Sequence, residues 1–264
     1  MMKKIANISQ THSLRPLDIQ RFVCDENMIL LNELDLVTFS FHSCHIDYFN
    51  KWSNFLKSKI DKIKIFRFNN DDYYTTIIKQ LEYFNNNGIT DFIFWQPDHY
   101  IVNTPGIENI IKSLLTFYKN SDCKYFNSFG GVWQELNRQK HINQNNVYTD
   151  DNIDIFKVSS LDFKDTNLSA FTDENYITNV KFITDTLFSK LSVLDNLWVM
   201  EKKCNDIFIS QDIDRYMTNK FIFARASIYG VERSDKWQEQ VNNDKILASN
   251  INCCIFEKKD YEPR

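Results

Sequence analysis

The chain has 264 residues, of which 43% are hydrophobic, 25% charged and 15% aromatic, and its formal net charge is −4. This balance excludes an extensively disordered chain. The acidic balance and the lack of a basic stripe argue against binding to duplex nucleic acid, whose phosphates attract lysine and arginine. A chain of this length can bury one large core, so we expect a single domain.

The sequence gives no sign of membrane insertion or secretion. No apolar stretch approaches the roughly 20 residues that a membrane-spanning helix needs. The segment Met1 to Asn7 is basic, but no apolar segment follows it, so we expect no signal peptide. The six cysteines are scattered without a C-x-x-C pair. These features favour reduced thiols and a cytoplasmic protein.

Strands and helices alternate through the first half of the chain. Residues 36–41 form the first predicted strand and residues 63–68 the second, because both are rich in β-branched and aromatic residues. Residues 46–60 and residues 74–84 each place their apolar side chains on one helical face. Gly88 follows the second of these helices and is expected to end it in the left-handed conformation.

The same alternation continues to residue 129. Residues 92–95 are four consecutive apolar residues, which predicts a strand buried on both faces. Thr104 is the expected cap of a helix that begins at Pro105 and carries its buried apolar side chains at positions 107–115, and residues 124–129 form a fourth strand. Residues 1–34 show no strong period, and no element is predicted there. The alternation predicts a parallel sheet with right-handed crossovers.

The second half is less regular. Residues 134–154 are polar and are expected to form a long loop, and residues 155–158 a short strand. A helix is predicted to begin at Asp173 and to run to Leu191, with another over residues 194–201. The apolar run at residues 221–229 suggests a further strand, which could be antiparallel.

The centre of the candidate site is the point where the buried strand ends. Pro97 cannot donate to a central ladder, so the strand must end before it. Asp98 and His99 therefore follow the carboxyl end of a buried strand, which is where open α/β sheets bind ligands.

Glycine-rich phosphate-binding motifs are absent. The five glycines, at positions 88, 106, 130, 131 and 230, cannot form a P-loop or the G-x-G-x-x-G fingerprint. If the protein binds a nucleotide, it must do so without a glycine-rich phosphate loop.

Residues 92–100, Phe-Ile-Phe-Trp-Gln-Pro-Asp-His-Tyr, resemble the acidic motif of GT-A glycosyltransferases of the inverting, family-2-like type. In that family an apolar strand runs into Gln-Asp-Asp and an aromatic residue. Gln96 matches the glutamine, Asp98 the last aspartate and Tyr100 the aromatic residue. Pro97 replaces the middle aspartate, which removes one possible metal ligand.

The resemblance implies a GT-A-like (Rossmann-like), mainly parallel α/β sheet flanked by helices. Residues from about 35 to 131 would form a nucleotide-sugar-binding half, and residues from about 132 to 264 a smaller, mixed acceptor-side half. The implied activity moves a sugar from a nucleoside diphosphate sugar to a glycan or another hydroxyl acceptor. Mn²⁺ or Mg²⁺ held by Asp98 and His99 would stabilise the charge on the departing diphosphate. For Asp98 the alternative is a loop carboxylate without a ligand, and for His99 it is a phosphate donor or a plain strand-end residue.

A second match assigns the catalytic base. Trp198-Val-Met-Glu201 resembles the Trp-x-x-Glu segment that some of these enzymes carry on the acceptor side, so Glu201 would take the proton of the acceptor hydroxyl. An exposed glutamate or a buried ion-pair partner is the alternative interpretation of Glu201.

The resemblance also implies further contacts with the donor. Ser40, His42 and Gln96 would contact the nucleotide, and Asp71 and Asp72 would recognise its base or ribose. For Ser40 and His42 an ordinary polar turn is an equal alternative. For the two aspartates the alternative is the solvated start of a helix.

Two other functions remain open. A sugar nucleotidyltransferase would use a related sheet, but that class normally carries a glycine-rich, basic loop after its first strand. Residues 39–45 contain neither glycine nor lysine. The other alternative is a non-catalytic sugar-binding or scaffold protein of the same fold.

Overall fold

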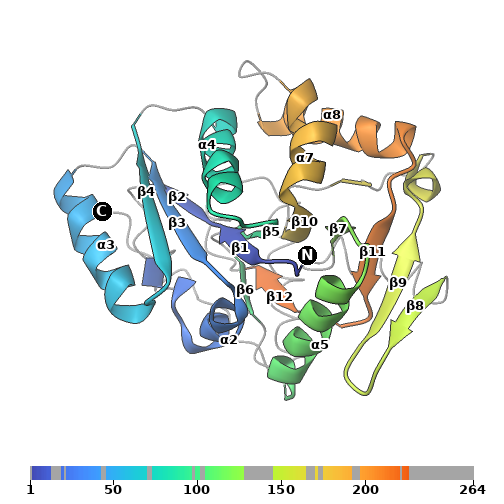
Figure 1. The fold of residues 1–264 in the computed structure, drawn as a ribbon, viewed down its shortest axis with the longest axis horizontal. Coiled ribbons are helices and arrows are strands. Elements are labelled where there is room, and N and C mark those ends of the chain that lie inside the picture. The colour runs from blue at the N-terminus through green and yellow to red at the C-terminus, as the bar shows by residue number, and fades with distance from the viewer. Residues whose placement is uncertain are drawn as a thin grey trace, which may run out of the picture.

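A mixed sheet runs through the molecule, with helices on both of its faces (Figure 1). The computed structural model describes residues 2–12, 19–20, 22–42, 46–69, 73–96, 99–101, 105–127, 145–164, 170–171, 175–191, 197–220 and 222–225. None of the helices in these ranges combines the length and the hydropathy that crossing a bilayer requires.

Twelve strands are present in the described ranges. They are β1 (Ile5–Ile8), β2 (Gln10–His12), β3 (Val37–His42), β4 (Ile63–Phe68), β5 (Asp91–Phe94), β6 (His99–Ile101), β7 (Tyr125–Phe126), β8 (Asn146–Thr149), β9 (Asp154–Val158), β10 (Tyr176–Asn179), β11 (Arg215–Thr218) and β12 (Phe223–Arg225). Seven of them pair in the order β1-β5-β10-β7-β11-β9-β8, three in the order β2-β3-β4, and β12 pairs with β6.

The helices divide between the two faces of the sheet. They are α2 (Asp25–Glu33), α3 (Ile46–Lys59), α4 (Tyr73–Asn86), α5 (Ile107–Asn120), α7 (Val180–Thr186) and α8 (Leu197–Ser210), with short 3₁₀ turns η1 (Ser160–Phe163) and η2 (Phe188–Lys190). One apolar core lies under α2, α3 and α5, and a second lies under α4, α7 and α8. Figure 1 shows α4, α7 and α8 together on one side of the strands.

The seven-stranded and three-stranded sheets are joined through the first strands. The Asn7 side chain bonds the backbone of Thr38 twice, donating to its carbonyl and accepting from its N–H, both at 2.9 Å. The Ser9 carbonyl accepts the N–H of Ser40 at 2.9 Å. β1 pairs in parallel with β5, and β2 in parallel with β3, so one nearly continuous segment connects both sheets.

Most predictions for the first half are confirmed, including the α/β, GT-A-like fold class. The strand predicted at residues 36–41 is confirmed as β3, but it is not the first strand, because β1, β2 and α2 precede it. The missed segment has polar residues at positions 7, 9 and 10, and their bonds to the neighbouring strand and to α4 replace the apolar contacts of an ordinary strand. The capping prediction is also wrong, since Gly106 caps α5 with a φ of 80° and Thr104 lies outside the described residues.

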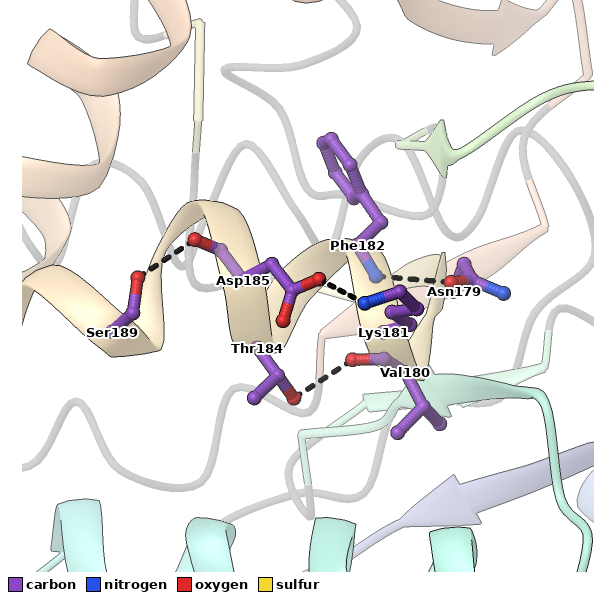
Figure 2. Close-up of polar contacts among 7 residues, drawn as sticks. All are labelled: Asn179, Val180, Lys181, Phe182, Thr184, Asp185 and Ser189. Carbon is purple, nitrogen blue, oxygen red and sulfur yellow. Dashed lines mark hydrogen bonds and ion pairs between the residues drawn. The ribbon is translucent and has the colours of Figure 1, made fainter.

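The predicted helix over residues 173–191 begins too early. Tyr176–Asn179 forms β10, which runs antiparallel between β5 and β7 and makes the sheet mixed. The helix α7 starts only after Asn179, whose side chain accepts the N–H of Phe182 at 2.9 Å. Figure 2 shows this cap together with the exposed ion pair between Lys181 and Asp185, at 2.5 Å.

In the predicted polar loop at residues 134–154, β8 occupies positions 146–149 and β9 begins at position 154, and positions 134–144 lie outside the described residues. The further strand predicted at residues 221–229 appears as β12, which pairs antiparallel with β6.

Candidate functional site

The carboxyl ends of five parallel strands meet at one edge of the sheet. Gln10 pairs with Ser40, and His42 pairs with Phe68, so β2, β3 and β4 end side by side. β1 and β5 end in the same direction. This edge is where a parallel α/β sheet binds its ligands.

Ser40 belongs to a buried chain of hydrogen bonds between the sheet and α4. Its hydroxyl donates to Gln80 Oε1 at 2.8 Å, and Gln80 Nε2 donates to the carbonyl of Thr76 at 3.2 Å. Thr76 Oγ1 in turn lies 3.4 Å from Gln10 Oε1. Ser40, Thr76 and Gln80 are wholly buried. Ser40 therefore links β3 to α4 at this edge of the sheet through a buried hydrogen bond.

Gln10 is a residue that the sequence did not single out. Its Nε2 is buried and has no hydrogen-bond partner among the described residues. Buried donors are almost always paired. An acceptor atom of a ligand bound at this edge would pair the Gln10 amide. The polar residues of this segment were the signal that could have drawn attention to it.

His42 lies half-buried at the end of β3, with its ring centroid 5.5 Å from that of Phe68. It therefore lies at the edge of the sheet where the nucleotide was predicted to bind. Asp71 and Asp72, which follow β4 in the sequence, lie outside the described residues.

The chain leaves β5 in a tightly bonded segment. The indole N–H of Trp95 donates to the carbonyl of His99 at 3.1 Å. Gln96 and His99, which flank Pro97 and Asp98, are joined by a backbone hydrogen bond of 3.0 Å. Asp98 itself lies outside the described residues. His99 is buried, with 3% of its surface exposed.

Asn175, directly before β10, binds this segment through a hydrogen bond. The sequence did not reveal this role. It is wholly buried, and its Oδ1 accepts the N–H of Gln96 at 2.7 Å. Its Nδ2 is a second buried donor without a partner in the described ranges. Asn175 therefore positions the chain where it enters the acidic motif.

Replacing Asn175 with alanine is expected to lower the free energy of unfolding by about 1–3 kcal/mol, because the buried N–H of Gln96 loses its acceptor. We also expect at least fivefold weaker donor binding, measured by thermal-shift titration. Asn219→Ala is the matched control, since Asn219 Oδ1 accepts the N–H of Asp154 at 2.9 Å. Unchanged donor binding by Asn175→Ala would show that Asn175 has only a structural role.

Glu201 lies near the same edge, in a pocket that it shares with Ile77 of α4 and Phe94 of β5. It lies half-buried in α8, and it is the one carboxylate among the described residues that line a narrow pocket of about 30 Å³. Phe94, the last residue of β5, and Tyr176 form one wall, with ring centroids 5.2 Å apart and nearly parallel planes. Burial, and then the charge of Glu201, raise the pKa of the Cys204 thiol to about 12.

The described residues do not form a complete metal site. No three His, Cys, Asp or Glu side chains come together in the described ranges, and His99 alone of the two predicted ligands lies within them.

The strand order, the helices on both faces and the antiparallel strand beside β5 define a GT-A-like α/β fold. The solved structure of S. aureus TarS 1-349 matches 97% of this chain and 67% of its own, with a TM-score of 0.53 and 12% identity. TarS 1-349 in complex with UDP matches 97% of this chain and 68% of its own, with a TM-score of 0.53 and 12% identity.

TarS 1-349 in complex with UDP-GlcNAc has a TM-score of 0.50, with the same coverage of 97% and 68% and 12% identity. At this identity the similarity shows a shared fold. No family model matches the sequence, and no curated protein matches it.

Proposed function

We propose that the protein is a glycosyltransferase that moves a sugar from a nucleoside diphosphate sugar to an acceptor hydroxyl. The position of Glu201 carries the proposal. This half-buried carboxylate lines an apolar pocket that reaches Phe94, the last residue of the strand that leads to Asp98. TarS has the same fold and was crystallised with UDP and with UDP-GlcNAc, which supports a nucleotide-sugar donor.

Glu201 would act as the general base of an inverting transfer. The acceptor oxygen forms a bond to the anomeric carbon while the bond from that carbon to the diphosphate oxygen breaks. The nucleoside diphosphate leaves with the bonding electrons, and the hydroxyl proton passes to the Glu201 carboxylate. The other residues that line the pocket are apolar or aromatic.

The donor would lie along the carboxyl ends of the strands. The Gln10 amide offers a hydrogen-bond donor there, and His42 and Gln96 lie at the same edge. Asp71 and Asp72 would contact the base or the ribose. Asp98, with His99, would hold Mn²⁺ or Mg²⁺ if the donor is bound through a metal.

A thermal-shift panel of nucleoside diphosphate sugars, with and without Mn²⁺, tests the donor site. The true donor should raise the melting temperature, because a ligand that binds the native state stabilises it. Asp98→Asn should weaken this binding at least tenfold, whereas Asp185→Asn, on the exposed surface of α7, should not.

If no nucleoside diphosphate sugar shifts the melting temperature, or if Asp98→Asn binds the donor as the parent does, the proposed donor site is wrong. Turnover of a nucleoside triphosphate would indicate a nucleotidyltransferase. Binding of a glycan without any nucleotide would indicate a non-catalytic protein.

A further inference from the structure

A second cleft lies at the opposite edge of the sheet. β7 and β11 run parallel, and Lys124 and Asp214 stand directly before them. Between these amino ends and the end of α8 lies a cleft of about 260 Å³, which we call the amino-edge cleft. Its lining includes Asp122, Lys124, Phe182, Gln211, Asp214 and Tyr216. The cleft is much larger than the pocket at Glu201, and the proposed transfer does not use it.

Tyr216 offers a hydrogen-bond donor to a ligand in the cleft. Only 8% of its surface is exposed, and its ring lies 6.0 Å from that of Phe117. Its side chain lines the cleft, where the hydroxyl reaches solvent and makes no hydrogen bond with any described residue. Burial raises the pKa of Tyr216, so the phenol remains protonated and can donate.

The charges around the cleft nearly balance. Asp214 forms an ion pair with Lys157 at 2.7 Å, and Asp212 Oδ1 lies 3.4 Å from the N–H of Leu161. Lys124 adds a second positive charge. The negative charges of Asp122, Asp212 and Asp214 would repel a phosphate group. A divalent cation would lack ligands, because no three metal-binding side chains cluster in the described ranges.

Several polar groups in the cleft remain available to a ligand. The side chains of Asp122, Lys124 and Gln211 are exposed, and no hydrogen bond joins them to another described residue. Together with Tyr216 they offer both donors and acceptors. A neutral ligand with several hydroxyl groups could use both kinds.

Phe182 supplies an apolar wall. Asn179 fixes the first turn of α7 by accepting the N–H of Phe182, and Figure 2 shows the Phe182 ring projecting from the helix on the side away from Val180 and Thr184. The ring is half-buried and lies 6.4 Å from that of Phe208. An aromatic face with a few convergent polar groups is the usual composition of a small-molecule site.

We propose that the amino-edge cleft binds one ring of a neutral glycan, with Tyr216 donating to a ring hydroxyl, Asp122 and Gln211 accepting, and Phe182 contacting the C–H face of the sugar. The cleft has room for a single sugar ring and lies at the edge of the sheet away from Glu201. It would therefore hold a glycan chain at a distance from the reacting hydroxyl.

Ligand-observed NMR and calorimetric titration with maltose, cellobiose, lactose and N,N′-diacetylchitobiose test this site without a nucleotide. At least one of the four should bind. Tyr216→Phe should weaken that binding about fivefold, the usual effect of one lost hydrogen bond. The matched control is Tyr148→Phe, whose hydroxyl bonds Asp150 at 2.8 Å outside the cleft. Glu201→Gln should leave the binding unchanged.

The proposal is overturned if none of the four sugars binds, or if Tyr216→Phe and Asp122→Asn both bind the sugar as the parent does. The proposal is also overturned if spermidine binds, Asp122→Asn abolishes that binding, and no sugar binds. That result would assign the cleft to an organic cation. Because the titration needs neither donor nor transfer, its result is independent of whether the proposed transferase activity is found.

Discussion

Glu201→Gln is expected to slow sugar transfer by about 10²–10⁴-fold, the usual contribution of a general base. Glutamine keeps the shape and the hydrogen-bonding oxygen of the side chain but cannot accept the proton of the acceptor hydroxyl. Because Glu201 lines a narrow pocket with apolar walls, no other carboxylate among its described lining residues can replace it. The measurement is the initial rate of transfer with the donor that the thermal-shift panel identifies.

Glu82→Gln is the matched control, since Glu82 is exposed on α4 and should leave the rate unchanged. Donor binding by Glu201→Gln should equal that of the parent, because the base acts on the acceptor. A parent-like transfer rate would remove Glu201 from the mechanism. A loss of donor binding would assign it to the donor site instead.

Asp91→Ala is expected to lower the free energy of unfolding by about 3 kcal/mol, because it leaves buried donors without an acceptor. Asp91 is wholly buried at the start of β5, where Tyr118 Oη donates to it at 2.9 Å and Thr90 Oγ1 at 2.6 Å. Asn179 Nδ2 lies 3.4 Å from the same carboxylate. One side chain thus links β5 with α5 and the start of α7.

Urea unfolding measures this loss. Asp91→Asn keeps one acceptor oxygen and should cost clearly less than Asp91→Ala. Asp61→Ala changes an exposed residue in the turn before β4 and should alter stability by less than about 0.5 kcal/mol. If Asp91→Ala is as stable as Asp61→Ala, the three hydrogen bonds to Asp91 do not contribute to stability.

The sequence predicted the elements whose pattern is regular. The helices α3, α4 and α5 have clear apolar faces, and β4 is rich in aromatic and β-branched residues. The segment β1–β2 was missed because polar side chains replace part of its apolar pattern. The pattern of β10 was mistaken for a helix because Ile177 and Val180 share a helical spacing, although pairing with two strands decides its structure.

The candidate site was predictable only in part. Glu201 was found through a short motif, and the structure places it in a pocket next to the end of β5. Asn175 and Tyr216 gave no signal, because an isolated polar residue reveals its role only through its burial and its partners in space, and the polar residues around Gln10 were a signal that the sequence analysis did not use. The role of Asp98 remains a prediction.

The insertion of β10 between β5 and β7 has a consequence for synthesis on the ribosome. A nascent chain that ends before Asn175 contains both neighbouring strands but not the strand that separates them. Until β10 has emerged, the edges of β5 and β7 that it will cover expose backbone groups that can pair with other chains. Long-range pairing of this kind also slows folding, because distant segments must meet before the sheet can close.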